Sequence, residues 1–112
     1  MREITGLALL RDVLAKLDEL KEENLFYLVG TLADQTWGPP FFDGPTGEYY
    51  AKLKAVNDAR AALRDAFGVA EAWMVPNASK DGMREALGRA VDKLLTGSYG
   101  YDEHCRVTWT SA

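Results

Sequence analysis

Residues 46–68, TGEYYAKLKAVNDARAALRDAFG, form the longest stretch of the sequence with a clear helical period. Bulky side chains recur along it every three or four residues, which is typical of one apolar stripe on an α-helix. The stripe consists of Tyr49, Leu53, Val56, Arg60, Leu63 and Phe67. Only Arg60 interrupts its apolar character, so the stretch predicts a central helix that packs against the rest of the fold.

A second row of small side chains runs beside this stripe, made of Ala51, Ala55, Ala59, Ala62 and Ala66. Alanine loses no side-chain entropy in a helix and lets a neighbouring backbone come close. We therefore expect the helix to bury two adjacent faces. A short coiled-coil seam with a partner is the alternative interpretation of the same pattern.

Both ends of the stretch carry residues that favour helix boundaries. The Thr46 hydroxyl can accept a hydrogen bond from the first turn, and Glu48 brings a carboxylate to the positive end of the helix dipole. Gly68 suits the left-handed conformation that often follows a helix. The pattern thus predicts a helix that begins after Thr46 and ends before Gly68.

Composition places the chain among ordinary globular proteins. Its 112 residues predict one domain, 1–112, and its 47% hydrophobic and 27% charged content is typical of soluble proteins. A net charge of −4, with basic residues spread along the chain, makes direct nucleic-acid binding an unfavoured interpretation. The one cysteine excludes an internal disulfide and a cysteine metal cluster, which fits a cytoplasmic location.

Three further segments predict helices. Residues 5–23 carry leucines at helical spacing, and charges interrupt the N-terminal sequence too often for a signal peptide or a membrane span. Residues 25–36 favour a helix capped by Asn24, although their first five residues, LFYLV, also fit a buried strand. Residues 80–96 predict the last helix, capped by Ser79.

The last predicted helix carries its own buried face and end signal. Gly97 is expected to end it, and residues 69–75 before it predict one short helical turn. The side chains expected on its buried face are Met83, Leu87, Val91, Leu94 and Leu95.

The C-terminal tail changes to a period of two. Cys105, Val107 and Trp109 alternate with polar residues, which is typical of a β-strand. Such a strand needs a partner, and the options are residues 25–29, another chain, or no partner if the tail lies over the helices.

Residues 37–45, WGPPFFDGP, predict a loop with an unusual aromatic content. Loops are usually polar, so these rings either close one end of the core or face a partner. Trp and Tyr contribute strongly to protein interfaces because they bury a large area with few rotatable bonds. The candidate binding residues are Trp37, Phe41, Phe42, Tyr49, Tyr50, Trp73 and Trp109.

Polar clusters give weak support for catalysis or metal binding. His104 and Cys105 are adjacent, and neighbours on a strand point to opposite faces, so a nucleophile pair is disfavoured. Asp102, Glu103 and His104 could supply metal ligands, but they include one imidazole only. Carboxylates also flank the aromatic loop at Asp34, Asp43 and Glu48, where turn and helix-start roles explain them better. We predict no catalytic residue, no metal site and no cofactor.

One segment resembles a known family. Residues 62–74, ALRDAFGVAEAWM, are followed by KDGMREAL at residues 80–87. The combination resembles a stretch in the C-terminal helical domain of acyl-CoA oxidases, where an Asp-Ala-Phe-Gly string precedes an Asp-Gly turn. The resemblance covers residues 62–87 alone and consists mostly of helix-end residues. That family's flavin site and catalytic carboxylate lie elsewhere, so the resemblance implies structural kinship at most and no oxidase activity.

Together these patterns predict an all-α fold, a compact bundle of about four helices to which the tail could add a short C-terminal β-strand. The function we favour is a non-catalytic protein-binding module: a small acidic subunit, adaptor or inhibitor whose partner is a protein, such as one with a basic surface. One alternative is a small-ligand-binding domain or enzyme with a pocket lined by Trp37, Tyr49, Tyr50, Trp73 and His104. Another is a homo-oligomeric structural protein. No membrane association is expected.

Overall fold

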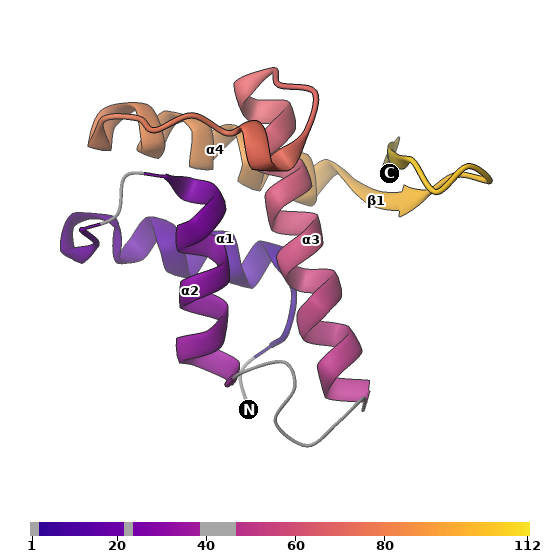
Figure 1. Cartoon of the computed structure of the whole chain (residues 1–112), viewed down its shortest axis with the longest axis horizontal. Coiled ribbons are helices and arrows are strands. Elements are labelled where there is room, and N and C mark those ends of the chain that lie inside the picture. Colours follow the sequence, from indigo (N-terminus) through magenta and orange to yellow (C-terminus); the bar gives the residue numbers. More distant parts are fainter. Residues whose placement is uncertain (1–2, 22–23, 39–46) are drawn as a thin grey trace.

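The computed structural model describes residues 3–21, 24–38 and 47–112 of the chain (Figure 1). Four α-helices are followed by a two-stranded antiparallel hairpin, which confirms the predicted helical bundle with a short C-terminal strand. The elements are α1 (Gly6–Ala15), the 3-10 turn η1 (Leu17–Glu19), α2 (Leu25–Trp37), α3 (Gly47–Phe67), the 3-10 turn η2 (Ala72–Met74), α4 (Lys80–Thr96), β1 (Gly97–Tyr101) and β2 (Val107–Ser111). The predicted Thr46 cap, and Phe41 and Phe42 of the aromatic loop, lie outside the described residues.

Local capping residues explain where the helices begin. The Asn24 side chain accepts a hydrogen bond from the Phe26 amide at 3.0 Å, which confirms the predicted start of α2 and selects helix over strand for this segment. Ser79 caps α4 in the same way, through the Gly82 amide at 3.2 Å. Gly68 has a φ of 67°, the predicted left-handed conformation after α3.

The first helix is shorter than predicted, because α1 ends at Ala15 and a separate 3-10 turn follows. The carbonyls of Leu17 and Leu20 accept hydrogen bonds from the Lys80 ammonium of α4. The Lys80 side chain, distant in the sequence, therefore pairs with two carbonyl groups that a helix continuing to residue 23 would have paired with its own amides.

Helix α3 contacts α1, α2 and α4, as the sequence predicted for a central helix (Figure 1). Its alanine row is the buried side: Ala55, Ala59 and Ala62 are each no more than 1% exposed. The core around it consists mainly of Leu9, Leu10, Val13, Leu25, Leu28, Val29, Leu32, Leu63, Met83 and Leu87. Small side chains thus let α3 approach several helices at once.

The predicted apolar stripe of α3 is only partly buried, and this corrects the sequence interpretation. Val56 and Leu63 belong to the core, whereas Leu53 is 42% exposed and Arg60 lies at the surface edge. The two rows are adjacent on the helix, and the core takes the alanine row because it permits the closer approach. Leu95, expected on the buried face of α4, is also exposed, at 53%.

The predicted tail strand pairs with residues 97–101, which were not among the partners expected from the sequence. β1 pairs antiparallel with β2, with Tyr99 opposite Trp109 and Tyr101 opposite Val107. Gly97 ends α4 as predicted, but with a φ of −173° the chain leaves the helix extended and passes directly into β1. Cys105 lies outside β2, in the connecting turn, with a φ of 60°.

None of the described helices combines the length and apolar character that crossing a membrane requires.

Two glycines provide a matched test of the α1–α3 packing. A Cβ atom on Gly6 would lie 2.9 Å from the Asp58 Cβ and 3.1 Å from the Ala55 carbonyl oxygen, whereas a Cβ on Gly88 would meet nothing within 4 Å. We expect Gly6→Ala to lower the free energy of unfolding by about 1–3 kcal/mol, because the added methyl group would force α1 and α3 apart. Gly88→Ala, in the interior of α4, should raise it by about 0.5–1 kcal/mol. Urea unfolding of the two variants measures both changes, and equal midpoints would contradict the packing.

Candidate binding groove on helix α3

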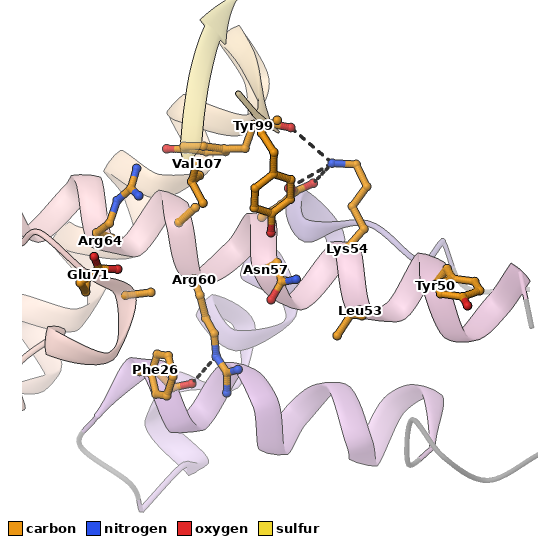
Figure 2. Close-up of a pocket in the computed structure, with 15 residues that line it drawn as sticks. Phe26, Tyr50, Leu53, Lys54, Asn57, Arg60, Arg64, Glu71, Tyr99 and Val107 are labelled. Atoms are coloured by element: carbon orange, nitrogen blue, oxygen red, sulfur yellow. Dashed lines mark hydrogen bonds and ion pairs between the residues drawn. The ribbon is translucent and has the colours of Figure 1, made fainter. Parts of the chain in front are cut away.

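A groove with a volume of about 730 Å³ runs along the outer side of α3 (Figure 2). We call it the α3 groove. It is bounded by α2, α3, η2 and the hairpin, and it is open to solvent along one side. Its lining residues are Phe26, Tyr50, Leu53, Lys54, Asn57, Asp58, Arg60, Ala61, Arg64, Glu71, Ala72, Tyr99, Gly100, Tyr101 and Val107.

The α3 side of the groove follows directly from helical spacing. Residues 50, 53, 57, 60 and 64 are three or four positions apart and therefore share one helix face. Tyr50 is 59% exposed and Leu53 is 42% exposed. Of the predicted stripe, this face includes Leu53 and Arg60, which the alanine packing turns away from the core.

The hairpin forms the opposite wall. The Tyr99 side chain is buried, and its hydroxyl donates a hydrogen bond of 2.6 Å to Asp65 Oδ2 on α3. Residues directly opposite each other share a face in an antiparallel pair, and alternate residues along a strand do too, so Tyr101 and Val107 project on the same side as Tyr99. Tyr101 lies further along the strand and is 64% exposed.

Contacts with α4 fix the orientation of the hairpin. The Trp109 indole nitrogen donates to the Lys93 carbonyl at 3.3 Å, and the Lys93 ammonium lies 4.1 Å from the centre of the Trp109 ring. Together with the Tyr99–Asp65 hydrogen bond, these contacts attach the hairpin to two helices. A two-stranded hairpin is only marginally stable alone, so the helices supply the support that the groove wall needs.

Arg60 crosses the groove from α3 to the start of α2 (Figure 2). Its Nε atom donates to the Phe26 carbonyl at 3.0 Å, and its guanidinium carbon lies 4.0 Å from the centre of the Phe26 ring. Burial lowers the pKa of Arg60, and electrostatic interactions, first with Asp34 and then with Tyr27, act in the opposite direction. Among the described residues, the direct contacts of the Arg60 guanidinium are a carbonyl group and an aromatic ring.

Asp34, whose charge raises the pKa of Arg60, forms its ion pair with Lys52. Its carboxylate accepts a hydrogen bond of 2.5 Å from the ammonium of Lys52, whose side chain is almost fully buried. Lys52 also donates to the Gly38 carbonyl, so it attaches α3 to the end of α2. Other cations of the groove have their own carboxylates: Lys54 lies 2.9 Å from Asp58.

Among the predicted binding residues that the structure describes, Tyr50 alone lines the groove. Tyr49 packs edge-to-face against Tyr50 with ring centres 5.0 Å apart, and Trp73 in η2 is 66% exposed. Trp37 ends α2 with a buried indole nitrogen that has no hydrogen-bond partner among the described residues, and Trp109 packs under the hairpin. The structure does not bring these rings together around one cavity.

The binding residues predicted from the sequence did not include Leu53, Arg60 or Tyr101, which line the groove. A charged residue at position 60 within an otherwise apolar stripe was a signal of an outward-facing position. Tyr99 and Tyr101 alternate with small residues in GSYGY, which was a weak signal of a strand.

The polar cluster at the hairpin turn has a structural role. Asp102 Oδ1 accepts hydrogen bonds from the amides of His104 and Arg106, at 2.8 and 2.9 Å. These bonds, that from Arg106 first, lower the pKa of the Asp102 carboxyl. Within residues 3–21, 24–38 and 47–112, no three His, Cys, Asp or Glu residues are grouped so that they could hold a metal ion.

Comparison of the chain with protein-family models, with curated proteins and with solved structures finds no match. The inference of function therefore rests on the residues that line the groove.

Alkaline titration tests the contact that holds the hairpin against α3. Burial, followed by the hydrogen bond to Asp65, raises the pKa of Tyr99. A raised pKa in the folded state means that this contact stabilises the fold fully below the ordinary tyrosine pKa of about 10 and is lost as the pH rises towards the folded value. Absorbance titration of the phenolate should show one of the five tyrosines ionising last. Tyr99→Phe should remove that last step, and a late step that persists in this variant would contradict the contact.

Proposed function

We propose that the chain is a non-catalytic protein-binding module, a small acidic subunit, adaptor or inhibitor that holds a segment of a larger protein in the α3 groove. The observation that carries this proposal is the exposure of three large apolar side chains along one groove. Tyr50, Leu53 and Tyr101 are 59%, 42% and 64% exposed. Apolar side chains grouped in this way are typical of surfaces that bind other molecules.

The composition of the groove supports a protein as the bound molecule. Its walls combine four aromatic residues with arginine, the residue types that contribute most strongly to protein interfaces. Both walls belong to secondary-structure elements attached to the core, so little ordering is required when a partner binds. The chain as a whole carries a net charge of −4, and we expect this acidic character to favour partners whose surrounding surface is basic.

The size of the groove supports small-ligand binding as a second candidate function. A volume of about 730 Å³ falls within the range of sites for small molecules. Such sites usually bury most of the ligand, whereas Tyr50 and Tyr101 on the two walls of this groove are both largely exposed. This openness favours an extended protein surface over an enclosed ligand.

A comparison of three baits tests the proposal. The wild-type chain, the groove variant Leu53→Ser with Tyr101→Ser, and the control Leu95→Ser are used to capture proteins from the native host. Leu95 is an exposed leucine on α4 outside the groove lining, so the control makes a similar substitution elsewhere. We expect a partner that wild type and control retain and that the groove variant binds at least about 10-fold more weakly.

Two results would oppose the proposal. Equal retention by all three baits would place the interface outside the groove. A wild-type bait that retains no protein, but co-purifies with a small molecule that the groove variant releases, would support the second candidate function instead.

A further inference from the structure

We propose that Arg60 is the anion-recognition residue of the α3 groove and that it binds the carboxylate of an aspartate or glutamate in the partner's segment. This inference rests on the proposed protein-binding function and specifies the chemistry of the segment.

Within the part of the chain that the structure describes, Arg60 is the cation of the groove without a carboxylate partner. Three basic residues line the groove, and two of them are neutralised within the chain: Lys54 by Asp58 at 2.9 Å, and Arg64 by Asp65 at 3.0 Å. Among the described residues, Arg60 forms no ion pair, and Nε is its one donor with a protein acceptor. A guanidinium group has five N–H donors, so most of its hydrogen-bonding capacity is available to a ligand.

The surrounding residues hold the Arg60 guanidinium in place before a partner binds. Phe26 supplies the carbonyl acceptor and the ring beneath the cation. Gly30, one turn further along α2, leaves the space in which Arg60 Nη2 lies, because a Cβ atom there would be 2.6 Å from that nitrogen. A side chain that is already fixed loses less conformational entropy on binding, which favours it as a recognition group.

Burial of the guanidinium adds a reason for it to bind an anion. Desolvation by burial is the largest influence on the pKa of Arg60, and the charge of Asp34 offsets it only in part. A carboxylate that docks beside Arg60 would replace lost hydration with a charge-assisted hydrogen bond. The planar fork of arginine fits two carboxylate oxygens, so the pairing also selects orientation.

Charge balance favours a carboxylate over a phosphate. The groove lining contains the cations Lys54, Arg60 and Arg64 and the carboxylates Asp58 and Glu71. Asp58 pairs with Lys54 and Asp65 pairs with Arg64, so one carboxylate would neutralise the remaining positive charge of Arg60, whereas a phosphate group carries about −1.5 to −2 at neutral pH. Leu53 and Tyr50 lie on the same face of α3 as Arg60, so the bound segment should combine its acidic residue with apolar neighbours.

Selection from a random-peptide library displayed on phage tests this inference. The library is panned on the wild-type chain, and peptides bound in the groove are identified by their loss of binding to Leu53→Ser with Tyr101→Ser. We expect these peptides to share one Asp or Glu flanked by apolar residues. A synthetic peptide of the consensus sequence is then measured beside its acid-to-amide analogue, Glu→Gln or Asp→Asn.

Arginine substitutions provide the matched comparison. Arg60→Met keeps the apolar stem and removes the charge, and we expect it to weaken peptide binding at least about 10-fold. Arg84→Met is the control, because Arg84 is an exposed arginine that pairs with Asp18 outside the groove. Wild type should prefer the acidic peptide over its amide analogue, and Arg60→Met should bind the two equally. Gly30→Ala, which displaces the guanidinium without removing it, should reduce the preference and guards against a folding defect in Arg60→Met.

Each remaining outcome has a distinct meaning. Groove-bound peptides without an acidic residue, or an unchanged acid preference in Arg60→Met, would overturn the assignment of Arg60 and leave the protein-binding proposal standing. Tighter binding of a phosphoserine analogue than of the carboxylate peptide would overturn the choice of anion. A selection that yields no groove-bound peptide would contradict the protein-binding proposal, and the inference on Arg60 with it.

Discussion

The close approach of α1 to the alanine row of α3 is the constraint on which the rest of the structure depends. Ala55 and Ala59 are buried there, and Gly6 approaches α3 so closely that a single added methyl group would lie 2.9 Å from the Asp58 Cβ and crowd the backbone of Ala55 and Ala59. Packing of this kind fixes the rotation of a helix about its axis, because the small row must face the neighbouring helix. The adjacent row, with Leu53 and Arg60, is then turned outward and becomes one side of a groove.

The hairpin completes the groove because α4 leads directly into it. Gly97 leaves the helix in an extended conformation, so β1 begins where α4 ends, and Trp109 and Tyr99 attach the two strands to α4 and α3. A surface that would otherwise be an exposed helix face is in this way enclosed on two sides. The hairpin thereby determines where Tyr101 stands relative to Leu53.

Local signals in the sequence predicted the helices well, and long-range packing explains what they missed. Asn24, Ser79 and Gly68 act within a turn of their own positions, so their effects could be inferred without the fold. The choice between the two adjacent faces of α3 depends on which neighbour approaches more closely, and periodicity treats both faces alike. β1 was missed because GSYGY is short and contains two glycines, which disfavour strands in isolation. Of the candidate site, only Tyr50 was predicted, because the groove joins residues from α2, α3, η2 and β1 that are distant in the sequence.

The orientation of α3 can be measured directly by cysteine modification. Leu53→Cys and Val56→Cys, each in a Cys105→Ser background, probe the groove face and the core face of the helix. We expect a thiol reagent to modify position 53 rapidly in the folded protein and position 56 only slowly, with both reacting alike after unfolding. Protection of position 53 equal to that of position 56 would show that the bulky stripe is buried as a whole, and the α3 groove would not exist.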